Sequence, residues 1–237
     1  MTKQDKPIEL HTWTTPNGFK VSIMLEEIGV PYNTHFVVIG RGEQFKPEFL
    51  KISPNNRIPA IIDPEGPDGK PISVFETGAI MMYLGRKFGQ LYPTSDERRR
   101  VEVEEWLIWQ VANIGPIFGN NNHFRTYAAD KHPYAIKRFV DETHRLFGIV
   151  EDRLNGRDFI CDEYSIADIA SFCWMRSPER RAVDIKEFPR VKSWIDRILA
   201  RPAVERGLAV KPPVEIDLAT DAEAQKIMFG QRSRAAE

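Results

Sequence analysis

A Thr-Pro-Asn sequence at residues 15–17 has the residue types needed to hold an anion at the start of a helix. Thr15 has the hydroxyl that commonly caps a first turn, and Pro16 suits the first helical position. The unpaired backbone amides of such a turn carry a partial positive charge, which lowers the pKa of a nearby thiol. Because this turn contains no cysteine, the sulfur would belong to a ligand. Simple capping by Thr15 and Asn17 is the alternative interpretation.

A second polar pair, Glu76 and Thr77, stands where a strand is expected to end and a helix to begin. The Thr77 hydroxyl and the amides beside it suit a carboxylate, and Glu76 can pair with an ammonium group. A ligand that carries both charges at one end would therefore fit here. An ordinary helix cap is again the alternative.

The two cysteines, Cys161 and Cys173, have neither the spacing of a C-x-x-C redox motif nor that of a zinc site. We expect them to be packing residues in a reducing compartment, with no disulfide between them. The first residues, MTKQDKPIEL, lack the apolar stretch of a signal peptide, and no apolar run approaches the ~20 residues of a membrane helix. These features predict a cytoplasmic protein.

The charges of the chain nearly cancel, with 33 Lys and Arg against 34 Asp and Glu and a net charge of -1. No overall basic field exists to attract nucleic acid or an anionic membrane, so neither is an expected partner. Hydrophobic residues make up 42% of the chain and charged residues 28%, which is typical of a globular protein. A length of 237 residues favours two compact domains.

Residues 1–89 have the pattern of a small α/β domain. Its expected elements are a strand at 8–13, an amphipathic helix carrying Val21, Met24, Leu25 and Ile28, a strand at 32–39, a short helix at 44–50, strands at 60–63 and 72–75, and a helix at 77–87. The first strand-helix-strand unit should be parallel and the last two strands an antiparallel hairpin. This order is that of a thioredoxin-like domain.

From residue 94 onward every strong hydrophobic period is helical, which predicts an all-α helical bundle over residues 94–212. The sequence at 94–97 resembles a capping box that opens a long helix, and Ser165 with Asp168 forms a second capping box. Residues 213–237 have no period, and we expect them to be a loosely held C-terminal tail.

Several segments together resemble the glutathione transferase superfamily. They are TTPNG at the first helix, SPNNRIP before the hairpin, FETGAI at the last helix of the front half, and YSIADIA and RPAVERG in the back half. The resemblance extends to about Val210. TPNG-x-K, RGEQFKPEFLKISPNNRIPAI and GNNNHF are similar in particular to the Nu class and to the prion-type nitrogen regulator of yeast, and Lys20 completes the first of these motifs.

The resemblance implies how glutathione would bind. Thr15 and Asn17 would hold its thiolate, and the backbone of Ile58, before a cis Pro59, would pair with the peptide like an added strand. Glu76 and Thr77 would bind the γ-glutamyl end, and Gln44 and Arg57 would reach the glycyl end. These are the residues expected to bind the glutathione peptide: Gln44, Arg57, Ile58, Glu76 and Thr77.

The helical half is expected to supply the other side of the pocket. Arg138 could steady the thiolate or a second carboxylate, and His123 and Phe124 could close the pocket. For His123 we favour packing or hydrogen bonding over acid-base catalysis. Three tryptophans could line an apolar substrate wall or belong to the core: Trp106, Trp109 and Trp174.

The resemblance to this subgroup implies a glutathione-dependent disulfide-bond oxidoreductase. The position of the activating tyrosine of many transferases is occupied here by Trp13, Thr14 and Thr15, and no cysteine is nearby. Conjugation of electrophiles or reduction of peroxides is one alternative, and a non-catalytic interaction domain that kept the fold is another. The expected partners are glutathione or glutathione disulfide and a second copy of the chain, without a metal or a nucleotide.

Overall fold

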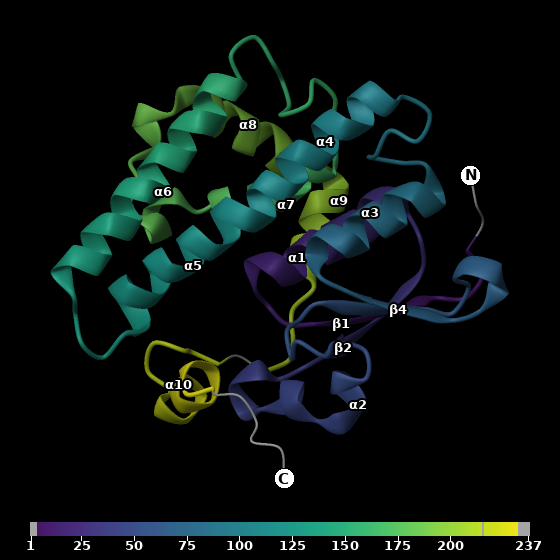
Figure 1. Cartoon of the computed structure of the whole chain (residues 1–237), viewed down its shortest axis with the longest axis horizontal. Coiled ribbons are helices and arrows are strands. Elements are labelled where there is room, and N and C mark those ends of the chain that lie inside the picture. Colours follow the sequence, from purple (N-terminus) through teal and green to yellow (C-terminus); the bar gives the residue numbers. More distant parts are fainter. Residues whose placement is uncertain (1–3, 215, 232–237) are drawn as a thin grey trace.

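The computed structural model describes residues 4–214 and 216–231, and its front part is built on a four-stranded sheet. The strands are β1 (Ile8–Thr12), β2 (Tyr32–Phe36), β3 (Ala60–Asp63) and β4 (Ile72–Phe75), in the order β2-β1-β3-β4. β1 pairs parallel with β2 and antiparallel with β3, and β4 pairs antiparallel with β3 (Figure 1). The predicted thioredoxin-like domain is confirmed.

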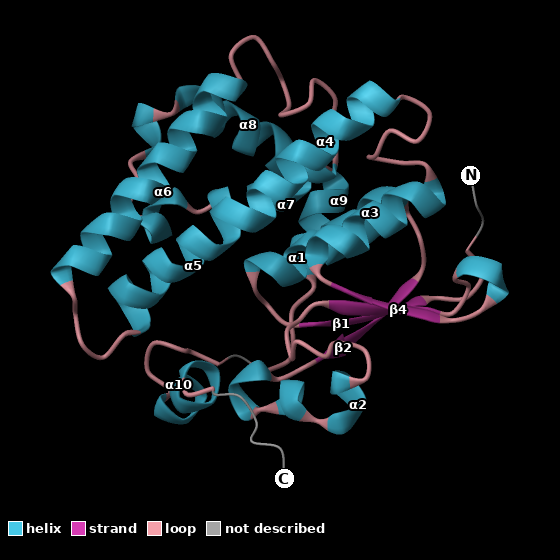
Figure 2. Ribbon diagram, in the orientation of Figure 1, coloured by secondary structure: helices cyan, strands magenta, loops and turns pink. Residues whose placement is uncertain are grey.

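Helices cover both faces of this sheet. Figure 2 shows α1 (Pro16–Ile28) and α3 (Thr77–Phe88) on one face and α2 (Pro47–Leu50) on the other. Successive side chains of a strand point to opposite faces, and the core divides accordingly. Leu10 and Ile61 are buried in the large cluster that includes α1 and α3, whereas Ala60 packs with Trp13 and Phe49 in a second cluster.

Two predicted elements of this domain differ from the prediction by more than one residue or are divided. The strand predicted to reach Ile39 ends at Phe36, because the chain turns into a 3-10 helix, η1 (Ile39–Arg41), that ends at Gly42 with a φ of 79°. The helix expected at 44–50 is divided into a 3-10 turn, η2 (Glu43–Phe45), and α2. Pro47 has no backbone N–H to continue a helix from η2, and it stands instead at the first position of α2.

The predicted helical bundle is also confirmed. Its helices are α4 (Glu97–Trp109), α5 (Gly115–Asn122), α6 (Pro133–Arg153), α7 (Ile166–Met175), α8 (Pro189–Leu199) and α9 (Pro202–Ala209). Two π-helical turns, η4 (Gln110–Ile114) and η5 (His123–Tyr127), follow α4 and α5. Within the described ranges, no helix has the length and apolar character needed to cross a membrane.

The two caps predicted for this bundle have different outcomes. Ser165 and Asp168 form the predicted capping box at the start of α7. At the start of α4 the cap is Asp96 alone, whose carboxylate accepts a hydrogen bond from the Arg99 amide at 3.1 Å. Asp96 is one of the preferred capping residue types, so the helix begins later than the Thr94 pattern suggests.

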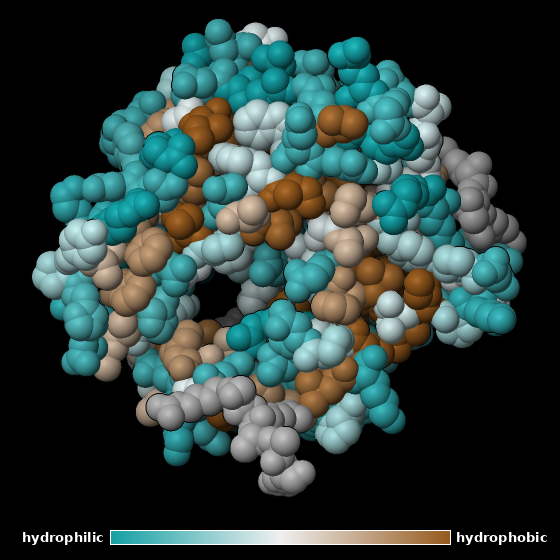
Figure 3. Space-filling view, in the orientation of Figure 1, coloured by the Kyte–Doolittle hydropathy of each residue, from teal (hydrophilic) through white to brown (hydrophobic). Residues whose placement is uncertain are grey.

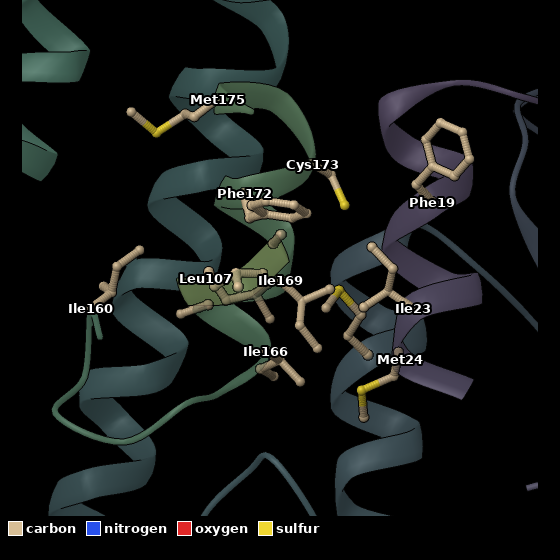
Figure 4. Packing of buried hydrophobic residues seen from close by; sticks show 14 of the residues in the cluster. Phe19, Ile23, Met24, Leu107, Ile160, Ile166, Ile169, Phe172, Cys173 and Met175 are labelled. Atoms are coloured by element: carbon tan, nitrogen blue, oxygen red, sulfur yellow. The ribbon is translucent and has the colours of Figure 1, made fainter. Parts of the chain in front are cut away.

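One interior joins the two domains and holds α1 in place. Figure 4 shows Ile23 of α1 facing Ile169 and Cys173 of α7. On another side of α1, Ser22 Oγ donates a hydrogen bond to the Gly207 carbonyl of α9 at 2.8 Å. A Cβ on Gly207 would lie 2.6 Å from the Ile23 Cα. The middle of α1 is therefore held by helices of the other domain.

The chain beyond residue 213 differs from the loose tail that we expected. Residues Ala222–Phe229 form a helix, α10, that lies beside η1 of the front domain (Figure 1). Ala224 is fully buried, and Ile216 and Met228 pack against the cluster that contains Trp13. Arg41 of η1 also pairs with Asp221 at 2.7 Å. The helix is short and its apolar residues are few, so its period is weak in the sequence.

Candidate active site

A cavity of about 280 Å³ opens between the two domains, where Figure 3 shows the surface hollowed between α1, α5 and α10. The front domain contributes Thr15, Asn17, Gln44, Arg57 and Ile58 to its lining, the bundle contributes His123, Tyr127, Trp174 and Arg181, and the C-terminal segment contributes Leu218, Met228 and Phe229. Two arginines line this cavity, and no aspartate or glutamate of the described chain does. The site therefore suits a ligand that carries negative charge.

Thr15 caps α1 as the sequence predicts. Its backbone is extended, and its Oγ1 accepts a hydrogen bond from the Gly18 amide at 3.0 Å. A Cβ on Gly18 would lie 2.1 Å from the Trp13 carbonyl oxygen, so glycine is needed for this tight turn. A hydroxyl that accepts one hydrogen bond can still donate its proton. Thr15 can therefore cap the helix and face a thiolate at the same time.

Asn17 is oriented by Trp174 of α7. The indole Nε1 of Trp174 donates a hydrogen bond to Asn17 Oδ1 at 3.0 Å. An indole N–H can only donate, so the Asn17 atom that faces Trp174 must be the amide oxygen. Within the described chain, the Asn17 NH₂ group has no acceptor, and Asn17 lines the cavity. Its N–H groups are thus available to a ligand.

A buried lysine lies behind these residues. Lys20 is 2% exposed, and its Nζ donates to Gln110 Oε1 at 2.7 Å and to Thr77 Oγ1 at 3.3 Å. Burial lowers the pKa of Lys20 to about 8. The nearby Cys173 and Glu76 side chains act in the opposite direction and raise it. Lys20 thus links α1, α3 and the π turn η4. Its place in TPNG-x-K was the only sign of this role in the sequence.

The predicted γ-glutamyl site lies at the start of α3, beside the cavity lining rather than in it. Glu76 has a φ of 67°, a rare backbone conformation for a residue other than glycine, and Asn55 Nδ2 donates to its carboxylate at 3.5 Å. Thr77 is buried over Lys20. The Ile58-Pro59 bond is cis, as the resemblance implied, and Ile58 lines the cavity.

Gln44 and Arg57 both line the cavity. Gln44 Nε2 donates to the Ile39 carbonyl at 2.9 Å, and its Oε1 is buried without a partner among residues 4–214 and 216–231. Arg57 donates to Asn56 Oδ1 and to Gln231 Oε1, each at 2.8 Å. Among the described residues Arg57 has no acidic partner, so its guanidinium can bind a carboxylate, whereas the free Gln44 Oε1 can only accept a hydrogen bond from a ligand. Their predicted role at the glycyl end stays a prediction.

The structure does not bring Arg138 to this cavity. Arg138 lies on α6, its side chain is 56% exposed, and it contacts Glu142 at 3.5 Å. Two residues along a helix correspond to a rotation of roughly 200°, so Arg138 lies on the opposite side of α6 from the partly buried Ile136. Among the described residues its partner is Glu142, one turn later on α6, and Glu142 does not line the cavity.

Arg181 lines the cavity instead, and sequence reasoning missed it. It is 6% exposed, its guanidinium lies 5.3 Å from the ring of Trp174, and its Nε has no hydrogen-bond partner within the described chain. Burial lowers the pKa of Arg181 to about 10, so the side chain remains charged at neutral pH. In the sequence it is one of two adjacent arginines, a pattern typical of an exposed turn.

Aromatic side chains close the remaining wall. The Phe229 ring lies 4.7 Å from His123 and 5.5 Å from Tyr127, which joins α10 to η5 across the cavity. Phe124 stacks on Phe139 at 5.4 Å and does not line the cavity. Of the three predicted tryptophans only Trp174 lines it, whereas the rings of Trp106 and Trp109 pack against each other at the edge of the core.

Neither cysteine lies in the cavity lining. Cys161 and Cys173 are buried and unpaired, and burial raises the pKa of each thiol to about 12. Both pack in the large core cluster, as predicted. Among the described residues, no group of three or more His, Cys, Asp or Glu side chains is arranged to hold a metal ion. A reactive thiol in this site must therefore come from a ligand.

Comparisons with known proteins agree with this architecture. The family model for the glutathione S-transferase N-terminal domain matches residues 7–86, and that for the C-terminal domain matches residues 123–202. The disulfide-bond oxidoreductase YfcG of Escherichia coli is 44% identical over 203 residues, which cover 85% of this chain and 94% of YfcG.

Two solved structures are similarly close. A glutathione transferase from Burkholderia graminis, with two glutathione molecules bound per subunit, has a TM-score of 0.83 and 45% identity, and the match covers 88% of this chain and 90% of that one. One from Pseudomonas putida, with one glutathione disulfide per subunit, has a TM-score of 0.83 and 42% identity, covering 89% and 94%. With both domains matched in order, this chain belongs to the glutathione S-transferase family.

Proposed function

We propose that this protein is a glutathione-dependent disulfide-bond oxidoreductase. The observation that carries the proposal is the arrangement at the start of α1, where Thr15 and an Asn17 held by Trp174 face a cavity without a protein thiol. Trp13, two residues before Thr15, is buried, and no tyrosine stands at residues 13–15. The similarity to YfcG, a disulfide-bond oxidoreductase, supports the same reaction class.

Glutathione binds with its sulfur at the first turn of α1. The helix amides, the Thr15 hydroxyl and the Asn17 NH₂ group donate to the thiolate and lower the pKa of the thiol. The extended peptide pairs with the Ile58 backbone, and the γ-glutamyl end lies at Glu76 and Thr77. Lys20, beneath Thr77, adds positive charge where the γ-glutamyl carboxylate binds.

Reduction then proceeds by two thiol-disulfide exchanges. The bound thiolate attacks one sulfur of a disulfide RSSR, a new S–S bond forms, and RS⁻ leaves and takes up a proton. A second glutathione thiolate attacks the mixed disulfide at the glutathione sulfur, which gives glutathione disulfide and a second RSH. Two glutathione molecules are oxidised for each disulfide reduced, and the protein supplies binding, alignment and a lowered pKa.

The test compares two reactions of the same enzyme. We expect reduction of 2-hydroxyethyl disulfide by glutathione to be faster than conjugation of glutathione to an aryl halide, each relative to its uncatalysed rate. Faster conjugation would assign the site to a conjugating transferase. Absence of any glutathione binding by calorimetry would instead indicate an interaction domain that kept the fold.

The proposal includes a homodimer of the Nu class that works in the cytoplasm. Val101 and Ile108 stand seven residues apart on α4, and their side chains are 43% and 51% exposed. Figure 3 shows apolar surface over this helix. A second copy covering this face accounts for its exposure. Sedimentation at micromolar concentration should give twice the monomer mass, and a Val101→Glu/Ile108→Glu variant should be monomeric.

A further inference from the structure

Arg181 is a buried cation without a partner. Its guanidinium has no hydrogen bond or ion pair with any described residue, although the side chain is 6% exposed. Arg201, at the junction of α1 and α9, shows how this chain otherwise accommodates a partly buried arginine. It forms two hydrogen bonds with the Glu27 carboxylate, at 2.6 and 2.8 Å. A buried charge without such a partner is costly, and a guanidinium suits bidentate binding of a carboxylate.

The surroundings of Arg181 add positive charge. Among the described residues, the groups that act on its charge are the Tyr127 phenol, the cations Arg180 and Arg125, and one carboxylate, that of Glu179. The Glu179 side chain is exposed and does not line the cavity. The described lining of the cavity holds Arg181 and Arg57 and no carboxylate. No described residue of the lining supplies a counter-ion, and a carboxylate of the ligand would fill this role.

One side chain connects this cation to the sulfur site. The ring of Trp174 packs against the Arg181 guanidinium at 5.3 Å, and its indole N–H holds Asn17 at 3.0 Å. Phe118 lies on the same guanidinium at 5.9 Å. Flat rings leave the edge of a guanidinium open, and that edge matches a planar carboxylate with two parallel hydrogen bonds.

We propose that Arg181 binds a carboxylate on the disulfide substrate, so that the preferred substrates are small disulfides with an anionic arm. This inference rests on the proposed function and names the substrate class of the same site. The carboxylate belongs to the leaving half of the disulfide, and the peptide part of the attacking glutathione is bound in the front domain. Arg181 is thus a specificity-determining residue.

The test uses three disulfides of similar size and different charge: anionic 3,3′-dithiodipropionate, neutral 2-hydroxyethyl disulfide and cationic cystamine. Each enzymatic kcat/KM is divided by the uncatalysed rate constant with glutathione. We expect wild type to prefer the anionic disulfide. Arg181→Met should lower kcat/KM for it by roughly tenfold to hundredfold, the range for a hydrogen bond to a charged group, and change the neutral disulfide by less than about twofold.

Two variants control for charge and fold. Arg180→Met removes an equal charge from the exposed neighbouring residue and should leave the preference unchanged. Arg181→Lys should restore part of it. Because methionine replaces a buried charge with an apolar side chain of similar length, Arg181→Met should keep the wild-type melting temperature or exceed it. Equal losses with all three disulfides, or a raised KM for glutathione alone, would overturn the inference.

A binding measurement separates this inference from the proposed function. The thioether 3,3′-thiodipropionate has the same carboxylates but no S–S bond, so it binds without reacting. Calorimetry with glutathione-saturated protein should show binding that Arg181→Met weakens at least tenfold. No binding to wild type would refute the anion site even if disulfides are reduced, whereas binding without any disulfide turnover would refute only the proposed reaction.

Discussion

The indole Nε1 of Trp174 donates a hydrogen bond to Asn17 Oδ1 at 3.0 Å, although 157 residues separate the two in the chain. This contact joins α7 of the helical domain to the first turn of α1. It fixes the direction of the Asn17 amide, whose N–H groups are left for the ligand. The chemistry proposed for the front domain therefore depends on a side chain from the other domain.

Replacing Asn17 should impair catalysis more than binding. We expect Asn17→Ala to lower kcat for disulfide reduction by about tenfold to hundredfold, which corresponds to a lost hydrogen bond to a charged sulfur of about 1.5–3 kcal/mol. Trp174→Phe, which keeps a ring beside Arg181 but removes the N–H, should cause a smaller fall. Trp109→Phe is the matched control, because Trp109 does not line the cavity.

Steady-state kinetics and calorimetric titration with glutathione would check this. The glutathione Kd should change by less than about threefold in Asn17→Ala, since the peptide is bound elsewhere. A variant with undiminished disulfide turnover would return Asn17 and Thr15 to ordinary capping of α1.

The cysteines should be dispensable for turnover. Burial raises the pKa of Cys161 and Cys173 to about 12, so neither forms a thiolate at neutral pH. We expect the Cys161→Ala/Cys173→Ala variant to keep most of its activity and to lose about 1–2 kcal/mol of unfolding free energy through the small cavities created. A well-folded double variant that binds glutathione but has no turnover would contradict ligand-borne chemistry.

Lys20 should make stability depend on pH. Burial lowers the pKa of Lys20 from 10.5 to about 8. Between these values the unfolded chain binds more protons than the folded one, so the Lys20 contribution to the free energy of unfolding increases as pH rises. Below pH 8 both states are protonated and the cost of burying the charge is fully present. Relative to Lys20→Met, wild type should gain up to about 3 kcal/mol across this range.

Urea unfolding at pH 7.5, 8.5 and 9.5 would measure this difference. Lys192→Met is the control, because the exposed Lys192 ammonium pairs with Asp196 on the surface of α8. Parallel curves for wild type and Lys20→Met would show that the buried ammonium does not titrate in this range.

Removing the Asp168 carboxylate should destabilise the helical domain strongly. Its oxygens accept hydrogen bonds from the Ile160 amide at 2.8 Å, the Ser165 amide at 3.0 Å and the Trp194 indole at 2.9 Å. Asp168→Ala leaves these buried donors unpaired, and we expect a loss of about 3–5 kcal/mol of unfolding free energy. Chemical denaturation would measure it, with the exposed Asp184→Ala as the control. A loss below about 1 kcal/mol would mean that water replaces the carboxylate.

Truncating Phe229 should open the cavity without unfolding the chain. Its ring contacts His123 and Tyr127 and is 41% exposed. We expect Phe229→Ala to raise KM for the disulfide about twofold to tenfold, the effect of one or two lost aromatic contacts, and to leave the glutathione Kd unchanged. Kinetics with 2-hydroxyethyl disulfide would check this. An unchanged KM would show that α10 does not border the bound substrate.

The order of elements could be predicted from the sequence because it depends on local patterns. Period-two and period-3.6 spacing, turn residues and helix caps act over a few positions, and β3, β4, α3 and the Ser165 capping box agree with the prediction. The motif at residues 15–17 identified the start of α1 for the same reason. Its cap, a cis Pro59 and a cavity bordered by Ile58 all agree with the resemblance.

Which side chains meet across the cavity was decided only by the tertiary structure. We expected Arg138 at the pocket, but its side chain is exposed on α6. Arg181, which no sequence motif marks, is instead buried at the cavity by the packing of Trp174 and Phe118. The place of α10 likewise depends on the apolar cluster around Trp13, far away in the chain. Contacts between distant segments are determined by the sum of many weak packing terms, which leave no periodic signal in any one segment.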